Sequence, residues 1–171
     1  MDLSKITSVS ELRQIIAECE KRISELNPYG NLKSLSNKAF GEEWSEPYIL
    51  SQVPALRKDN SAGHDMFSEK YDRVEVKSAR LPLKTITYNQ CHPYECEYFL
   101  FVNYDTENGG EEIFFIPSRD ITNEQLFSKS KQHSRIEESC YTISGSTKKN
   151  KQSFSKYRFM TFSELNKFLE V

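Results

Sequence analysis

The feature that most constrains the fold of this 171-residue chain is a pair of apolar runs joined by a tight turn. Residues 96–104, CEYFLFVNY, are almost continuously apolar, which is typical of a central strand covered on both faces. The next residues, DTENGG, favour a turn into the second apolar run, EEIFFIP, at 111–117. We therefore expect these two runs to form a β-hairpin within a larger sheet.

A second pair of strands is predicted in residues 63–80, GHDMFSEKYDRVEVKSAR, at about 63–67 and 72–80 with SEKY as the turn. Side chains alternate along a strand, so Val74 and Val76 share one face while Glu75 and Lys77 share the other. Two interpretations are open. The pair is a surface ion bridge on an exposed strand, or it works together with Asp65 upstream.

Helical patterns flank these strands. Ser8 and Glu11 form a capping box that opens a helix to about Leu26, and this helix either packs on its own sheet or forms a dimer interface. Its apolar stripe is Leu12, Ile15, Ile16, Cys19, Ile23 and Leu26. Residues 34–56 are expected to be mainly helical, with Pro47 marking a break or the first turn of a second helix.

The C-terminal third is predicted to contain both element types. Thr122 with Gln125 begins a short helix, and Thr161 with Glu164 begins a helix that runs to the C-terminus. Residues 139–144 and 155–160 are expected to pair as strands, joined by the polar loop GSTKKNKQS. Together these elements predict an α/β fold, a central mixed β-sheet flanked by α-helices.

Composition narrows the class of protein. With 37% hydrophobic and 28% charged residues, the chain is expected to form a single globular domain. It has no apolar run long enough to span a bilayer and no secretory signal pattern, so we expect a cytoplasmic protein. CHPYEC contains the one close cysteine pair, whereas structural zinc usually needs two such pairs, which favours ordinary reduced thiols over zinc.

Charge is unevenly distributed, although the net value is only −2. Residues 97–125 contain seven acidic side chains and a single arginine, whereas residues 128–160 contain eight lysines and arginines against two glutamates. The basic segment is either a surface that faces a polyanion or a solvated loop face.

Asp65, Glu75 and Lys77 have a specific chemical use if the two short strands pair. Two carboxylates that converge on one point can bind a hard divalent cation such as Mg²⁺ through oxygen. A lysine beside them can position, or help to deprotonate, a water that attacks phosphorus.

The pattern Asp65…Glu75-Val76-Lys77 resembles the motif of the PD-(D/E)xK nuclease superfamily, with His64 standing where proline is often found. The preceding GEEWSE segment resembles the upstream helix of that family, which carries a further glutamate. The layout of residues 36–117 is also similar to the family's catalytic core, and the EVKS context resembles small type II restriction endonucleases.

This resemblance implies a restriction-endonuclease-like core with Asp65, Glu75 and the Val76 carbonyl as ligands of Mg²⁺. Lys77 would activate water or stabilise the transition state, and the helical glutamate would be Glu43, with Glu42 the next choice. The partners implied are double-stranded DNA, a second copy of the chain and a cognate DNA methyltransferase. Residues proposed to contact DNA are Arg80, Lys84, Lys131, His133, Arg135, Lys148, Lys149 and Lys151, the last six within the basic DNA-recognition region 128–160.

Two other functions remain open. The same chemistry would serve a repair or junction-resolving nuclease that recognises DNA shape. Alternatively, the chain is a nuclease-like DNA-binding module without catalysis. The N-terminal helix, residues 1–30, would mediate dimerisation in the restriction-enzyme hypothesis.

Overall fold

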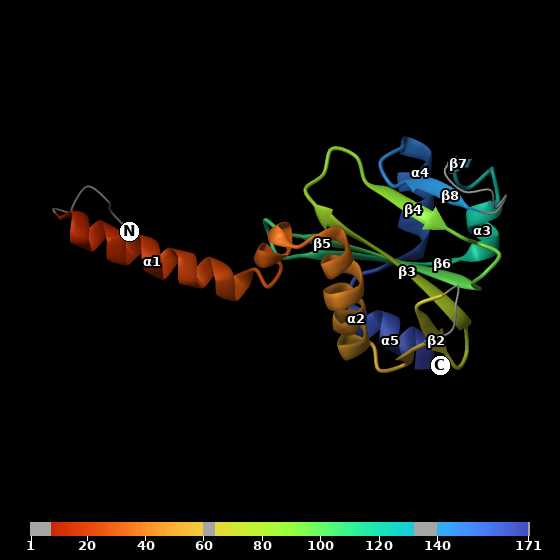
Figure 1. The fold of residues 1–171 in the computed structure, drawn as a ribbon, viewed down its shortest axis with the longest axis horizontal. Helices are drawn as coiled ribbons and strands as arrows, with labels where there is room; N and C mark the ends of the chain where they lie inside the picture. The colour runs from red at the N-terminus through yellow and green to blue at the C-terminus, as the bar shows by residue number, and fades with distance from the viewer. Residues whose placement is uncertain (1–7, 60–63, 132–139, 171) are drawn as a thin grey trace.

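The fold is known from a computed structural model that describes residues 8–59, 64–131 and 140–170. Within these ranges the chain is a mixed α/β structure with a large sheet, a small sheet and flanking helices (Figure 1). No helix in the described ranges combines the length and the apolar character needed to cross a membrane.

In the described ranges the large sheet has six strands in the order β1-β2-β3-β5-β6-β9. Among these strands β3 and β5 are the only parallel neighbours, and the remaining neighbours are antiparallel. The β5–β6 hairpin and the β2–β3 pair confirm two predictions from the sequence. The strands are β1 (Leu56–Lys58), β2 (Met66–Ser68), β3 (Asp72–Leu81), β5 (Tyr98–Asp105), β6 (Glu111–Pro117) and β9 (Arg158–Phe159).

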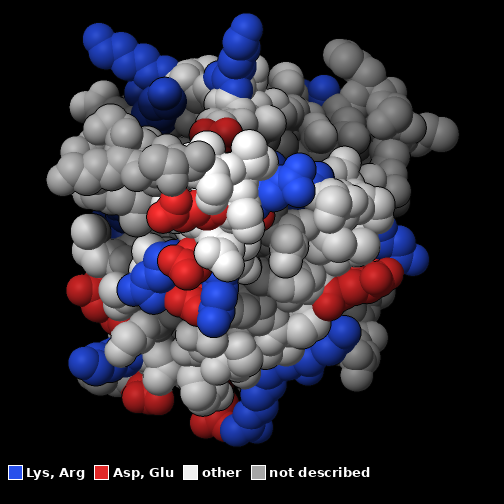
Figure 2. All heavy atoms as spheres, turned by 90° about the vertical axis from the view of Figure 1, so that its left-hand side faces the viewer, with Lys and Arg blue, Asp and Glu red and all other residues white. Residues whose placement is uncertain are grey.

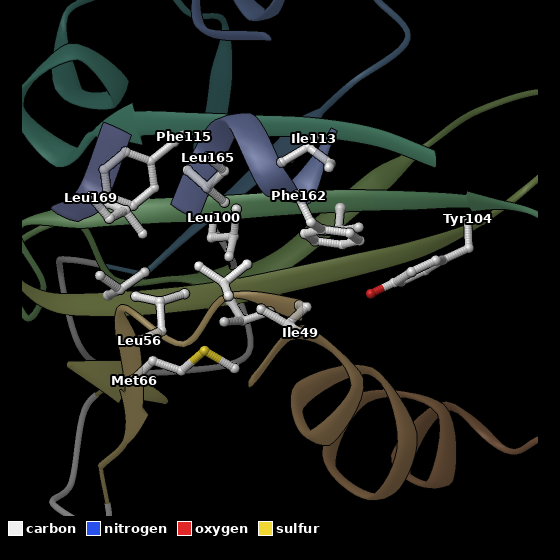
Figure 3. Packing of buried hydrophobic residues seen from close by; sticks show 14 of the residues in the cluster. Ile49, Leu56, Met66, Leu100, Tyr104, Ile113, Phe115, Phe162, Leu165 and Leu169 are labelled. Atoms are coloured by element: carbon white, nitrogen blue, oxygen red, sulfur yellow. The ribbon is translucent and has the colours of Figure 1, made fainter. Parts of the chain in front are cut away.

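Strand β5 divides the apolar interior into two clusters, because its side chains alternate between the faces of the sheet. Leu100, Val102 and Tyr104 point to one face. There they pack with residues from α2 (Glu46–Gln52) and α5 (Phe162–Glu170), as Figure 3 shows for Ile49, Phe162 and Leu165. Phe99 and Phe101 point to the other face and join a second cluster. Both faces of β5 are therefore covered, as its continuous apolar run predicted.

The second cluster is closed by the small sheet, whose strand order is β4-β8-β7. Its strands are β4 (Thr87–Cys91), β8 (Tyr141–Ser144) and β7 (Lys129–Lys131). Two short helices, α3 (Ser118–Thr122) and α4 (Lys148–Phe154), contribute Ile121 and Phe154 to the same cluster. The face of β3 that carries Glu75 and Lys77 lies on this side of the large sheet, opposite the face with Val74 and Val76.

Three expectations for the C-terminal third are wrong. GSTKKNKQS contains helix α4, which Thr147 caps by accepting a hydrogen bond from the Asn150 N–H, rather than a plain loop. The strands on either side do not pair with each other, because β8 pairs with β4 and β7 while β9 pairs with β6. The short helix begins at Ser118 and ends at Thr122, so Thr122 does not cap it.

The N-terminal segments lead from a projecting helix into the domain. Helix α1 (Val9–Leu26) has the predicted Ser8 cap but buries none of its residues, and it extends away from both sheets (Figure 1). It does not pack on the sheet of its own chain. The short helical turns η2 (Gly30–Ser34), η3 (Ala39–Ser45) and η4 (Ser155–Tyr157) complete the described elements.

Candidate active site

The candidate site lies on the part of β3 that follows its pairing with β2. Strand β2 pairs with β3 only from Asp72 to Val74, so the following residues of β3 present an edge that β2 does not cover. On that edge the Val76 N–H donates a 2.8 Å hydrogen bond to Asp65 Oδ2. The N–H and C=O of one strand residue project to the same side, so the Val76 carbonyl lies on the edge that Asp65 faces. Asp65 and Val76 are thus brought together, as the sequence indicated.

Glu75 and Lys77 form a largely buried ion pair on one face of β3. Lys77 Nζ lies 2.5 Å from Glu75 Oε1, and the Lys77 and Glu75 side chains are only 17% and 13% exposed, respectively. An ordinary surface ion bridge would leave both groups in water, so this geometry excludes the simpler of the two interpretations. A buried pair of this kind contributes little net stability relative to apolar residues of similar volume. Stability alone therefore does not explain why a charged pair stands at this position.

Electrostatics around this pair show an excess of negative charge. Burial raises the pKa of Glu75 above its ordinary value; it outweighs the attraction of Lys77, and the charge of Asp65 acts in the same direction as burial. Burial opposes the charge on Lys77, but attraction and a hydrogen bond from Glu75 outweigh it, so the pKa of Lys77 is also raised.

A third carboxylate, Glu46, belongs to this group and was not identified from the sequence. Burial raises the pKa of Glu46 to about 7, and the charges of Asp65 and Glu75 act in the same direction, whereas Lys58 lowers it. Glu46 is half-buried at the start of α2 and lines the cleft beside Lys77. Both glutamates proposed from the sequence, Glu42 and Glu43, are exposed on η3.

The reason for this difference is the backbone of η3. This segment is a π-helix, and the Glu46 N–H reaches back to the Gly41 carbonyl, five residues earlier. Such a widened turn shifts every following side chain relative to a 3.6-residue period, so regular spacing from Phe40 cannot select the residue that faces β3. Pro47, which lacks an N–H, follows directly and is a sequence signal for irregular helical bonding here.

A cleft of about 390 Å³ is lined by Glu46 and Lys77, whereas Asp65 and Glu75 are not among its lining residues. Its lining also includes Val76 and residues of the 83–89 segment. A second cleft of about 410 Å³ shares Leu83 and Tyr88 with the first. Its lining includes the basic residues Lys84, Lys151 and Arg158.

The residues proposed to contact DNA fall into different environments. Lys84 and Lys151 are exposed and line the second cleft. Lys131, Lys148 and Lys149 are exposed on β7 and α4, outside both clefts, and Lys149 donates to the Glu124 carbonyl. His133 and Arg135 lie outside the described residues.

The Arg80 side chain is held by contacts within the protein. Its guanidinium donates to the carbonyls of Leu32 and Leu35, at 3.0 and 2.6 Å, and to Asn37 Oδ1 at 2.6 Å. It also lies over the Phe40 ring, 4.8 Å from its centroid. These contacts tie the segment before η3 to β3, so Arg80 holds the wall of the first cleft in place.

His64 and Asp59 fix the approach to Asp65. His64 is buried and its Nε2 lies 2.9 Å from Asp59 Oδ2, while the Asp59 N–H donates to the Asp65 carbonyl at 3.1 Å. His64 therefore positions the backbone that carries Asp65, in agreement with a structural role rather than a general base.

The cysteines of CHPYEC do not assemble a zinc site in the described part of the chain. Cys91 and Cys96 are buried free thiols, and burial raises the pKa of each to about 12. No three His, Cys, Asp or Glu side chains among the described residues are close enough together to hold a metal ion.

The same result bears on Mg²⁺. Asp65, Glu75 and Glu46 supply only oxygen donors, the type that Mg²⁺ prefers, and their charges raise the pKa of Glu46 and of Glu75. In the described structure, however, Glu75 is bonded to Lys77 and Asp65 to the Val76 N–H, and the carboxylates are not drawn into a closed ligand shell. The donor set fits a hard divalent cation, and binding would require these side chains to turn toward it.

Comparison with known proteins adds no assignment: no model of a protein family matches the chain, and no curated protein matches it significantly in sequence.

Proposed function

We propose that this protein is a Mg²⁺-dependent DNA endonuclease with a PD-(D/E)xK-type active site on a restriction-endonuclease-like core. The observation that carries the proposal is that Asp65 bonds the edge of β3 at Val76, between the paired Glu75 and Lys77, while Glu46 lies within electrostatic reach of both carboxylates and lines a cleft with Lys77. The negative charge of these three carboxylates exceeds the positive charge of the cations near them, and a bound divalent cation would reduce that excess.

Each residue has a defined part in this proposal. Asp65, Glu75 and Glu46 would hold the metal through carboxylate oxygens, together with the Val76 carbonyl. The bound Mg²⁺ would supply charge stabilisation at the phosphate and at the leaving oxygen. Lys77, already directed at Glu75 Oε1, would donate to the attacking water or to the phosphate oxygens. Burial of Lys77 fixes its side chain and limits competing water.

DNA is the substrate that best fits the surroundings. The second cleft adjoins the first through Leu83 and Tyr88 and carries Lys84, Lys151 and Arg158. Cationic side chains along this cleft could follow a phosphate backbone that leads to Lys77. We propose type II restriction of double-stranded DNA by a homodimer, because twofold sites are most simply cut by twofold enzymes.

The test is cleavage of supercoiled plasmid with Mg²⁺, with Mn²⁺ and with EDTA. Discrete fragments that are lost in Glu75→Ala and Lys77→Ala would support restriction, provided that circular dichroism shows both variants to be folded. Asp65→Asn supplies a variant of nearly unchanged shape should either alanine variant unfold. Absence of cleavage of any DNA with either metal would refute the catalytic proposal.

The same experiment separates the two alternatives. A repair or junction-resolving nuclease would cut branched or damaged DNA and leave intact plasmid whole. A binding module would cut nothing, yet would retard DNA in a gel with an affinity that falls steeply as salt increases.

A further inference from the structure

Helix α1 exposes an apolar seam that nothing in the described chain covers. Val9, Ile16, Ile23 and Leu26 are 67%, 54%, 61% and 61% exposed, and Leu12 is 41% exposed. An isolated helix of about this length is marginal in water, and most helices gain their stability from packing one apolar face. The exposed seam therefore indicates a partner.

The spacing of the seam identifies the kind of partner. The side chains that form it follow one another at alternate intervals of three and four residues: Val9, Leu12, Ile16, Cys19, Ile23 and Leu26. This is the a/d repeat of a coiled coil. The a positions carry only β-branched residues, and leucine occupies the first and last d positions. That combination favours two parallel strands over three or four.

We propose that α1 pairs with α1 of a second copy of this chain as a short parallel two-stranded coiled coil. The helix carries four acidic and three basic residues, so electrostatic repulsion between two copies of it is weak. Figure 2, which faces the side from which α1 extends, likewise shows acidic and basic side chains interspersed rather than gathered by sign.

The apolar area that pairing would bury is small. Full burial of one Val, Leu or Ile removes ~60–120 Å² of apolar surface from water, and the ten aliphatic seam residues of two helices are 41–67% exposed before pairing, so they bury ~300–700 Å². The stems of flanking charged side chains add to this area. The total lies below the ~1,200–2,000 Å² range of specific interfaces, so the proposed pairing is a small interface that depends on protein concentration.

The base of α1 is fixed to the domain, which gives the coiled coil a structural consequence. Asn27 Nδ2 donates to the carbonyls of Thr106 and Glu107, at 3.0 and 3.2 Å, and Asn27 Oδ1 accepts from the Tyr29 N–H. Gly109 has a φ of +81°, and a Cβ there would lie 2.8 Å from the Leu26 carbonyl oxygen. The β5–β6 turn thus holds the end of the helix closely.

Parallel pairing would place both domains at the same end of the coiled coil, whereas antiparallel pairing would separate them by about the helix length of ~27 Å. Adjacent domains would allow two active sites to act on the two strands of one duplex. This last consequence rests on the proposed function, whereas the pairing itself does not.

The test measures assembly without DNA, so its failure is distinguishable from failure of the nuclease proposal. Sedimentation of the full chain should give a species of twice the 20.0 kDa chain mass. Ile16→Lys, which places a charge in the seam, should raise the dimer dissociation constant at least ~100-fold. The matched control is Ala17→Lys, which adds the same charge on the outer face of α1 and should leave the constant within about threefold.

Orientation is tested by oxidation of Leu26→Cys in a Cys19→Ser background. Parallel strands bring the two new thiols together, and a disulfide-linked dimer should appear on a non-reducing gel. A monomer at tens of micromolar, a dimer that is insensitive to Ile16→Lys, or a Leu26→Cys dimer that forms no disulfide between its two helices would each overturn the proposal. Circular dichroism should show a folded domain in every variant, because α1 buries no residue against it.

Discussion

Replacement of Lys77 by methionine should destabilise the metal-free protein by ~3–5 kcal/mol at neutral pH. This substitution keeps the volume of the side chain and removes its charge, which leaves Glu75 buried without its partner. An exposed pair would lose only ~0–1 kcal/mol, whereas breaking a buried pair typically costs ~3–5 kcal/mol. The 13% and 17% exposure of Glu75 and Lys77 and their 2.5 Å contact place this pair in the second class.

The expected loss corresponds to a fall of ~6–20 °C in the melting temperature of a chain of this size. It should depend on pH. Without Lys77, the pKa of Glu75 in the folded state rises further above its value in the unfolded chain. The penalty is therefore complete above the folded-state pKa and disappears as pH falls toward the unfolded-state pKa.

Chemical unfolding in urea, followed by circular dichroism, measures this loss. The double variant Glu75→Gln/Lys77→Met supplies the control, because it removes both charges and should recover most of the stability. The buried-pair interpretation would be refuted if Lys77→Met lost less than ~1 kcal/mol, the most that an exposed pair contributes. It would also be refuted by a loss that is the same at pH 5 and pH 8.

Other side chains give three further expectations. Because the pKa of Glu46 is raised to about 7, metal-free Glu46→Gln should melt higher than the parent above pH 7 and equally below about pH 4, as followed by thermal unfolding across pH. Arg80→Ala should lower the free energy of unfolding by ~1.5–3 kcal/mol, because it removes hydrogen bonds from a charged group. Lys151→Ala should leave the free energy of unfolding within ~0.5 kcal/mol of the parent. It should reduce the slope of log K for DNA binding against log salt concentration by ~0.9. In the Ile16→Lys variant, whose α1 is unpaired, Ellman's reagent should modify one thiol quickly, the exposed Cys19, and all four after unfolding; rapid modification of two or more in the folded variant would contradict the described burial.

Strand alternation and turn residues were the features of the sequence from which most of the sheet could be predicted. Alternation placed Val74 and Val76 in the core and Glu75 with Lys77 on the opposite face, and the structure has this arrangement. The depth at which Lys77 lies could not be predicted, because the small sheet that helps to bury it is assembled from distant segments. One of its strands, β4, has only Tyr88 and Cys91 directed inward and an irregular register between them.

Two differences between the sequence expectations and the structure have identifiable physical causes. The resemblance placed the helical glutamate at Glu43, with Glu42 next, whereas the structure directs Glu46 to the site, because the π-helical turn before Pro47 changes the phase of the helix. The segment with α4 was expected to be a loop from its polar composition. Its helix depends on long-range contacts of Asn150, which exchanges hydrogen bonds with the backbone of Ser128 and donates to the Ser144 carbonyl. Local composition cannot report such contacts.

The most direct test of the proposed active site compares Glu46→Gln with Glu43→Gln in Mg²⁺-dependent cleavage of plasmid DNA. Both substitutions remove one carboxylate from the same helical region, but only Glu46 shares the electrostatic environment of Asp65 and Glu75. We predict that Glu46→Gln lowers the cleavage rate at least ~100-fold, while Glu43→Gln cuts at the parent rate. Equal rates in the two variants, or loss of cleavage in Glu43→Gln alone, would contradict the site described.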